Sequence, residues 1–259
     1  MWPDWLRDHV PRRITSRGQQ SVTLYKDREP EHTVRHRTGD PHAARLRIVC
    51  EICNTGWMSR LQEQTKAILV PMLAGNNVTL YPKDQKLLAR WIAMFVMTNE
   101  FSNNDQTKIA ISARERTFVM NRNRAPANWR IWIGRFERSD ADGLWAHHSI
   151  PISDKRHPID MTEDDRPIAN TQATTFAIGD IYVTVLSSAI TEIVRRWHFG
   201  PRGAQLLKQI WPTIHRAVHW PLPFMALDDA TVFAGAFFRS GTGIQVPYGK
   251  LFSPKDIGM

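Results

Sequence analysis

The chain is poor in cysteine: only two occur among its 259 residues, at positions 50 and 53. A disulfide framework needs several spaced cysteines, so this composition excludes a fold held together by disulfides. Long apolar runs are also absent, because no segment approaches the ~18 uninterrupted apolar residues of a transmembrane helix. The first residues, Met1–Arg7, lack the basic start and apolar run of a secretory signal peptide. We therefore expect a cytoplasmic protein.

Positive charge is what the chain has in excess. Its 34 Lys and Arg residues against 25 Asp and Glu give a net charge of +9 and a sequence pI near 9.9. The surplus is concentrated in residues 1–50 and 101–138. A solvated basic surface and a nucleic-acid-binding surface both explain this pattern. We expect DNA as the partner, with no membrane and no small-molecule cofactor.

Length and hydrophobic periodicity indicate an α+β protein of one large domain or two small ones. Residues 1–45 hold four prolines among many charges and predict short strands and loops, with residues 21–25 as the best strand. The Ser59–Gln62 stretch has the form of a capping box at the start of a helix, and Ser112 is suited to cap another. Helices are predicted from about residue 59, over 82–100 and 113–120, and near 188–197 and 201–210.

Period-two alternation in the second half of the chain predicts strands over residues 130–136 and 144–152, followed by a charged loop over 154–168. A hairpin is predicted over 174–186, with its turn at Gly179 and Asp180. The tail after Trp220 carries four prolines and no assignable element. Three tryptophans sit in apolar patterns and are expected in the core: Trp91, Trp132 and Trp211.

Cys50 and Cys53 form a CxxC pair, for which three interpretations compete. A redox dithiol would follow a strand in a βαβ unit and open a helix, whereas here the predicted helix starts several residues later. Two inert thiols are a second possibility. Metal binding is favoured, because a turn at this spacing joins two soft ligands and Gly56 permits a tight backbone. A structural zinc needs four ligands, and His32, His36 and His42 are the nearest histidines that could complete a Cys2His2 site.

The stretch Val49-Cys50-Glu51-Ile52-Cys53-Asn54-Thr55-Gly56-Trp57-Met58-Ser59, read with Trp2-Pro3-Asp4-Trp5-Leu6, carries a family resemblance. It resembles bacterial and phage HNH endonuclease-like proteins, whose members show CxxC, then EHV(W/F)PxWL, then VCxxCNxGWM. The resemblance is good over residues 1–75 and weaker beyond them.

The resemblance implies a treble-clef zinc fold in which two CxxC knuckles hold a structural zinc, Cys50 and Cys53 forming the second. It also implies a His general base on the first hairpin and a catalytic Mg²⁺ or Mn²⁺ that polarises the scissile phosphate. Asn54 matches the last position of the HNH pattern, where His or Asn helps to bind the catalytic metal. Its side chain could equally cap the turn.

The chain departs from this pattern at its start. The family's catalytic His and first CxxC would precede Met1, and Arg45 stands near the place of the family's middle Asn. We expect a start codon placed too far downstream or a truncated gene, and no DNA cleavage by the family mechanism from the chain as written. Nothing in the sequence fixes His9 near Asn54 as a replacement base. The nucleotide sequence upstream of Met1 distinguishes the two explanations.

Two segments follow from these observations: an incomplete HNH-like module over residues 1–75, and an α+β C-terminal domain of unassigned role over 76–259. The function predicted from the resemblance is a metal-dependent DNA endonuclease of HNH type. Its phosphate contacts would come from basic residues of the first segment: Arg12, Arg13, Arg45 and Arg47. The alternatives are a non-catalytic nucleic-acid-binding protein and a phage accessory protein derived from such a nuclease.

Overall fold

The computed structural model describes residues 4–10, 16–23, 31–38, 48–102, 105–136 and 145–239. The helical elements of this part are η1 (Asp4–Asp8), α1 (Glu51–Cys53), the π-helical turn η3 (Asn54–Met58), α2 (Ser59–Leu73), α3 (Pro82–Asn99), η4 (Glu100–Ser102), η5 (Gln106–Lys108), α4 (Ala113–Asn121), α5 (Thr191–Arg196), α6 (Gly200–Leu206) and α7 (Leu227–Arg239). The strands are β1 (Ser16–Thr23), β2 (Glu31–Thr38), β3 (Val78–Leu80), β4 (Trp129–Phe136), β5 (Trp145–Ile150), β6 (Thr171–Ile178), β7 (Ile181–Ser188), β8 (Leu207–Trp211), β9 (Val218–Trp220) and β10 (Phe224–Met225).

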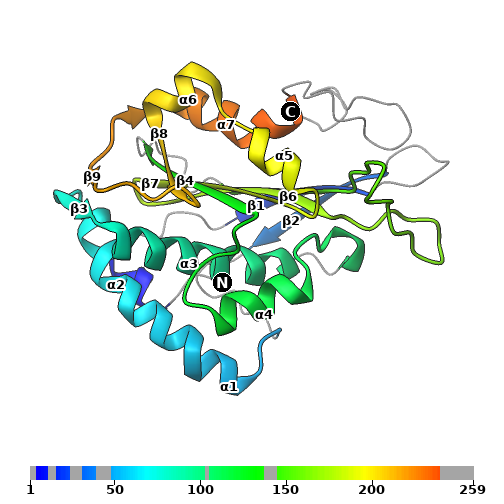
Figure 1. Cartoon of the computed structure of the whole chain (residues 1–259), viewed down its shortest axis with the longest axis horizontal. Coiled ribbons are helices and arrows are strands. Elements are labelled where there is room, and N and C mark those ends of the chain that lie inside the picture. The colour runs from blue at the N-terminus through cyan, green and yellow to red at the C-terminus, as the bar shows by residue number, and fades with distance from the viewer. Residues whose placement is uncertain are drawn as a thin grey trace.

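A six-stranded sheet lies between two helical layers, with α2, α3 and α4 on one face and α5, α6 and α7 on the other (Figure 1). The strand order is β10-β4-β7-β6-β5, and β8 pairs with the same edge of β4 as β10 does. All pairs are antiparallel except β10 with β4. This arrangement confirms the predicted α+β class.

The predicted hairpin is β6 and β7, which pair in register from Thr171 with Ser188 to Ile178 with Ile181. Its two-residue connection is Gly179–Asp180, and Gly179 has φ 54°, a left-handed conformation that glycine adopts without a Cβ clash. Both strands are buried along their whole length. The tight turn at Gly179–Asp180 therefore fixes the pairing register of β6 and β7, the two strands in the middle of the sheet.

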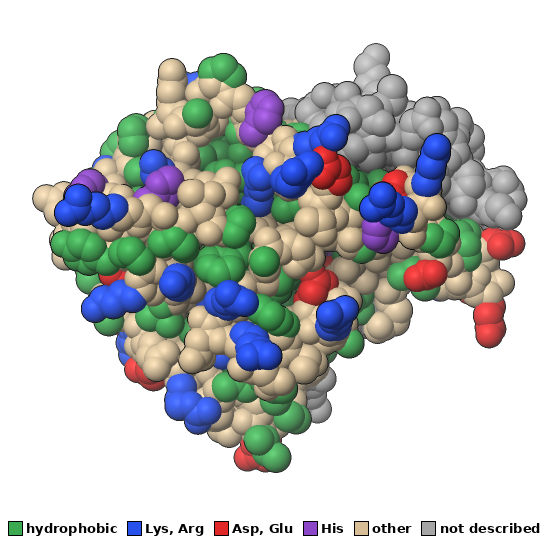
Figure 2. Space-filling model, viewed as in Figure 1, with side chains coloured by type: hydrophobic (Ala, Val, Ile, Leu, Met, Phe, Trp, Pro, Cys, Tyr) green, Lys and Arg blue, Asp and Glu red, His purple; other side chains and the backbone are tan. Residues whose placement is uncertain are grey.

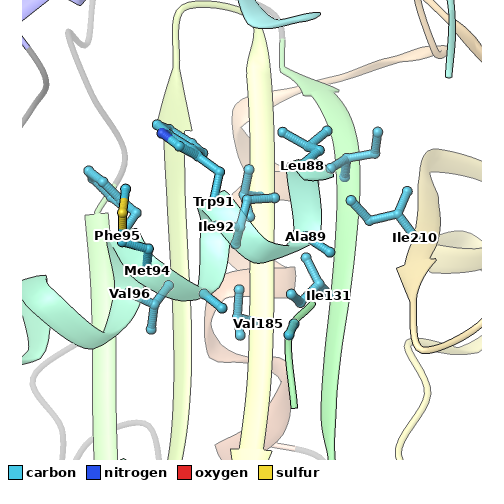
Figure 3. Packing of buried hydrophobic residues seen from close by; sticks show 14 of the residues in the cluster. Leu88, Ala89, Trp91, Ile92, Met94, Phe95, Val96, Ile131, Val185 and Ile210 are labelled. Atoms are coloured by element: carbon cyan, nitrogen blue, oxygen red, sulfur yellow. The ribbon is translucent and has the colours of Figure 1, made fainter. Parts of the chain in front are cut away.

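The first hydrophobic core fills the space between α2, α3 and one face of the sheet. Along α3, Leu88, Trp91, Ile92 and Phe95 recur at helical spacing, and Trp91 is 1 % exposed. Figure 3 shows the side chains of α3 meeting strand residues such as Val185 of β7. The core crosses the predicted boundary at residue 75, and the indole N–H of its Trp220 donates to the Met72 carbonyl at 3.2 Å.

The second core lies on the opposite face of the sheet, under α5, α6 and α7. Trp132, Tyr182 and Leu186 alternate with the strand residues of the first core and face this side. The Tyr182 hydroxyl donates to the carbonyl of Ala230 on α7 at 3.1 Å, and burial raises its pKa. The three tryptophans predicted to be in the core are all buried, with Trp132 on this face and the other two on the first.

The helices predicted from residue 59, over 82–100 and over 113–120 are confirmed as α2, α3 and α4. Ser112 caps α4: it accepts from the Glu115 N–H at 3.2 Å, and the Glu115 carboxylate accepts from the Ser112 N–H at 3.0 Å. Ser59 is not a cap, because residues 51–58 are already helical and Ser59 has α-helical dihedrals (φ −60°, ψ −46°).

Two other expectations for the C-terminal half change. The helix predicted over 201–210 ends at Leu206, since residues 207–211 pair with the free edge of β4 as β8. The unassigned tail contains α7, whose apolar side covers the second core. Among the described helices, none combines the length and the apolarity needed to cross a membrane.

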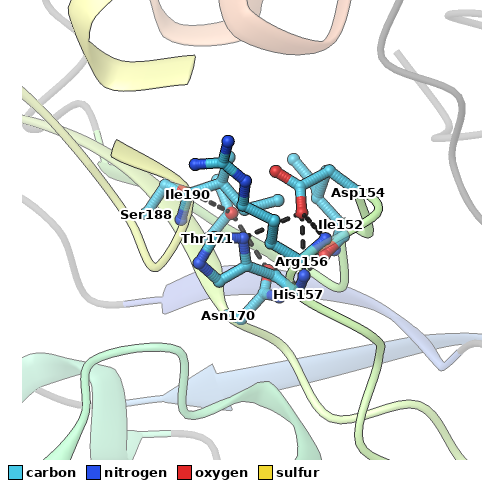
Figure 4. Close-up of polar contacts among 8 residues, drawn as sticks. All are labelled: Ile152, Asp154, Arg156, His157, Asn170, Thr171, Ser188 and Ile190. Carbon is cyan, nitrogen blue, oxygen red and sulfur yellow. Dashed lines mark hydrogen bonds and ion pairs between the residues drawn. The ribbon is translucent and has the colours of Figure 1, made fainter. Parts of the chain in front are cut away.

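The predicted loop over 154–168 is confirmed, and polar contacts secure it (Figure 4). The Asn170 side chain accepts from the Ile152 N–H at 3.0 Å and donates to the Ile152 carbonyl at 2.8 Å. It thus satisfies both backbone groups of Ile152, as a neighbouring strand would. The Asp154 carboxylate accepts from the His157 N–H and pairs with its ring, and these bonds lower the pKa of Asp154.

Candidate metal centre at Cys50 and Cys53

The cysteine pair lies at the beginning of a helical run. Cys50 has extended dihedrals (φ −67°, ψ 155°) and immediately precedes α1, which ends at Cys53. The Asn54 N–H donates to the Cys50 carbonyl at 3.0 Å, and the run continues through a kink at Gly56 into α2. The predicted turn, with a helix only from about residue 59, is therefore wrong at this point: a helical turn carries the pair, and residues 48 and 49 before it are in neither a helix nor a strand.

This geometry bears on the redox interpretation of the pair. The gap expected between the pair and the helix spoke against a redox dithiol, and no such gap exists. The βαβ setting of a redox motif is nevertheless not observed: in the described part of the chain, the only parallel pair is β10 with β4, far from Cys50 in the sequence.

The two thiols contact each other and differ in acidity. The Cys53 N–H and the Cys53 thiol both hydrogen-bond the sulfur of Cys50, and these bonds lower the pKa of the Cys50 thiol. The contact with Cys50 raises the pKa of Cys53. Both cysteines are free; Cys50 is exposed and Cys53 is partly buried. The thiolate is the form that binds a metal, and Cys50 would reach this form at lower pH than Cys53.

Asn54 follows the pair directly and is exposed on η3. The capping bond in this turn comes from its neighbour instead, because the Thr55 hydroxyl donates to the Glu51 carbonyl at 2.8 Å. No described residue hydrogen-bonds the Asn54 side chain, and the residue is exposed. Within the described residues, this side chain therefore does not cap the turn.

Trp57 connects the cysteine segment to the rest of the helical layer. The Arg90 guanidinium lies 5.5 Å from the centroid of its ring. Arg90 also donates to the carbonyls of Val119 and Met120, both at 3.1 Å, and to the Asn123 side chain at 2.9 Å. The carbonyl ends of α4 carry partial negative charge, so they compensate the buried guanidinium. These contacts place the end of α4 beside the segment that holds Asn54.

The two stretches that carry the family resemblance share one core. Leu6 of η1 is fully buried in the same cluster as Met58 and Leu61, with Trp5 and Trp57 packed at its margin. Lys66 of α2 also lies over the Trp5 ring, at 5.9 Å from its centroid. The N-terminal stretch and the CxxCNxGWM stretch thus contribute side chains to the same core, and the N-terminal stretch contacts α2.

Of the remaining predicted residues, only His9 has a described side chain. Their positions are as follows: His9 is half-buried against Trp5, His32 and His36 lie on β2, of which the backbone is described, and His42, Arg12, Arg13, Arg45 and Arg47 lie outside the described residues. Among the described residues, no three His, Cys, Asp or Glu side chains converge as a metal site. A structural zinc needs four ligands, and the described residues offer only the two thiols of Cys50 and Cys53 at this place.

A second polar cluster runs along the first-core face of the sheet. The His147 ring bonds the Ser149 hydroxyl at 3.0 Å and the Thr174 hydroxyl at 2.7 Å, and Thr174 donates on to Gln172. Desolvation, helped by His148, lowers the pKa of His147 to about 3. A histidine with so low a pKa is a poor base for activating Ser149.

No known protein family, curated protein or solved structure matches this chain significantly. The site must therefore be interpreted from its own chemistry. Sequence reasoning missed Arg90, which lies on the apolar side of α3, and it missed Arg122 and Arg124 just after α4. The basic character of residues 101–138 was the available signal for the last two.

Proposed function

We propose that the chain is a metal-dependent DNA endonuclease of HNH type, in which residues 4–10 and 48–73 contribute to the nuclease module. Cys50 and Cys53 would hold a structural zinc, and Asn54 would help to bind a catalytic Mg²⁺ or Mn²⁺. When bound, the catalytic metal would stabilise negative charge on the phosphate during hydrolysis. The chain's own residues would position that phosphate.

The observation that carries this proposal is that Leu6 and Met58 are buried in the same hydrophobic core. The two stretches that resemble the family are separated by more than forty residues of sequence and contribute apolar side chains to this one core. On the outside of the same segment, the polar residues of the pattern, Cys50 and Asn54, are exposed. Apolar positions inside and ligand positions outside are what a metal-binding module requires.

The test is an assay of DNA binding and cleavage by the full chain with Mg²⁺ or Mn²⁺. Cleavage that is lost in Asn54→Ala would support the proposal and would overturn the expectation that the chain as written does not cleave DNA. Thr55→Ala is the matched control, since Thr55 is the exposed neighbour and its bond to Glu51 is local. Cleavage that survives in Asn54→Ala would contradict the catalytic role of Asn54.

The second candidate is a nucleic-acid-binding protein without nuclease activity. The observation that favours it is the net charge of +9 together with basic side chains on α3 and α4 that have no ion-pair partner in the described structure. It expects salt-sensitive DNA binding and no cleavage with either metal. Absence of DNA binding at low salt would contradict both candidates and favour the accessory-protein alternative.

A further inference from the structure

The arginines on one side of the sheet are engaged in ion pairs. On α5, Arg195 and Arg196 both pair with Glu192. On α6, Arg202 pairs with Asp229 of α7 at 2.6 Å. These are all the Lys and Arg residues of α5 and α6, and each of them forms an ion pair, with Arg195 and Arg196 sharing one carboxylate.

The opposite helical layer is different. Five exposed basic residues on α3, on α4 and just after α4 have no ion pair within the described structure: Lys83, Lys86, Arg114, Arg122 and Arg124. Figure 2 shows more Lys and Arg than Asp and Glu over this layer.

The two acidic residues of α3 and α4 that approach this surface are already engaged by uncharged donors. Asp84 accepts from the Tyr81 N–H at 3.0 Å. Glu115 accepts from Ser112, from the Asn128 amide at 2.9 Å and from the Trp129 indole at 2.9 Å. Neither carboxylate forms an ion pair with the five basic residues, and two negative charges against five positive ones leave the layer positive.

The end of this basic surface reaches the candidate metal centre. Arg90 contacts Trp57 on one side and Asn123 on the other, so the Asn121–Arg124 stretch is one side chain away from η3. The stretch is exposed throughout and reads Asn-Arg-Asn-Arg. Arg124 lies over the Phe118 ring at 5.7 Å from its centroid, and its N–H donates to the Arg122 carbonyl at 2.6 Å. These interactions hold the backbone and one guanidinium in place.

We infer that Arg122 and Arg124 bind the phosphodiester backbone of double-stranded DNA where it leaves Asn54, and that Lys86 and Arg114 extend this track along α3 and α4. The inference rests on the proposed function, because it names where the same DNA runs. Guanidinium groups suit the role, since their planar donors match two phosphate oxygens at once. Arg90, which is committed to α4 and Trp57, does not bind the DNA but fixes the two arginines relative to Asn54.

The experiment measures binding of the full chain to a fluorescent duplex by anisotropy over a salt titration from about 50 to 200 mM, the range in which binding through phosphates weakens steeply. The test variant is Arg122→Gln/Arg124→Gln, in exposed residues whose side chains make no hydrogen bond within the described structure. The matched control is Arg195→Gln/Arg196→Gln, which removes the same formal charge from the opposite side.

We expect the test variant to weaken binding about tenfold or more. The slope of log K against log salt should fall by about 1–2, because each phosphate that the protein no longer neutralises lowers the slope by about one unit. The control is expected to stay within about twofold of the parent chain.

Three results would count against the inference. Equal weakening in both variants would overturn it, since net charge alone would then explain the effect. Unchanged binding by the test variant, with a parent chain that binds, would overturn the inference and leave the proposed function standing. A parent chain that binds no duplex at low salt would overturn both.

Discussion

The guanidinium of Arg90 lies 5.5 Å from the centroid of the Trp57 ring and donates to the Val119 carbonyl at 3.1 Å. One buried side chain thus fastens the cysteine segment to the end of α4. Its charge is balanced by carbonyl oxygens and a π face, and no described carboxylate pairs with it. The position of the candidate metal centre on the helical layer depends on this contact.

Replacing Arg90 by Met keeps the apolar stem and removes the donors. Because the Val119 and Met120 carbonyls then lack a partner in a buried place, we expect the free energy of unfolding to fall by ~2–4 kcal/mol. Urea unfolding measures it. Arg114→Met, at an exposed position, is the control and should change stability by less than ~0.5 kcal/mol. An Arg90→Met chain as stable as the control would show that the contact is dispensable.

Zinc content tests the cysteine pair. If Cys50 and Cys53 hold a structural zinc, the purified chain should contain about one zinc ion, and Cys50→Ser should lose it, because a hydroxyl is a far weaker zinc ligand than a thiolate. Elemental analysis of dialysed protein gives the stoichiometry. Ser59→Ala, an exposed change on the same helical run, should retain the metal. Equal zinc in Cys50→Ser and the parent chain would argue against this site.

Glu100 predicts a stability change with pH. The residue is 1 % exposed, its carboxylate accepts from the Ala110 N–H at 2.7 Å, and burial raises its pKa from 4.5 to about 7. The folded state therefore keeps a proton that the unfolded state releases between these values, so this group's contribution falls as pH rises from 4.5 to 7. The full effect is up to ~3 kcal/mol, at about 1.4 kcal/mol per pKa unit.

Glu100→Gln mimics the protonated carboxyl and keeps the acceptor for Ala110. We expect the variant to lose this part of the pH dependence and to gain stability relative to the parent chain as pH rises from about 5 to about 7.5, the window that the raised pKa defines. Denaturant unfolding at both pH values measures the difference. Parallel pH profiles for the two proteins would contradict the assignment.

His147 acts in the opposite direction. Its pKa is lowered to about 3 in the folded state, against 6.5 for an ordinary histidine, so the unfolded state alone takes up the proton between these values. Stability is therefore lost as pH falls from 6.5 towards 3. Because the residue keeps some exposed area, we expect ~1–2 kcal/mol and not the full effect of the shift.

The measurement compares acid unfolding of His147→Gln with that of the parent chain. The variant should lose stability less steeply below pH 6.5, because glutamine takes up no proton in either state. His219→Gln, at an exposed position on β9, is the control and should follow the parent profile. Since the windows of His147 and Glu100 overlap with opposite signs, only the single variants separate the two contributions.

Much of the fold was predictable because its signals are local. The β6–β7 hairpin is indicated by the Gly179–Asp180 turn, and α4 by the Ser112 cap with Glu115. The start of α3 is indicated by Pro82, whose fixed φ suits a first helical turn, and by Asp84. In each case, neighbouring residues decide the structure.

The failures come from contacts between distant segments. Residues 207–211 form a strand because β4, about seventy-five residues earlier, offers a free edge. Arg90 interrupts the apolar stripe of α3, and only its acceptors on α4 explain why it is there. The cysteine pair was expected on a turn that precedes the helix. The backbone is instead helical from Glu51 and continues through a kink at Gly56 into α2. The phosphate contacts assigned to Arg12, Arg13, Arg45 and Arg47 stay predictions.

Burial along the whole of β6 and β7 has a consequence for the order of assembly. One side of these strands is covered by α3, which the ribosome delivers before them, and the other by α5, α6 and α7, which emerge later. During synthesis, the face of the hairpin that α5, α6 and α7 cover is therefore exposed to water until α7 has been made. The Tyr182 hydroxyl gains its acceptor, the Ala230 carbonyl, only after 48 further residues have been synthesised. In the finished molecule, the amides of these two strands should exchange with solvent more slowly than those of the helices that seal them.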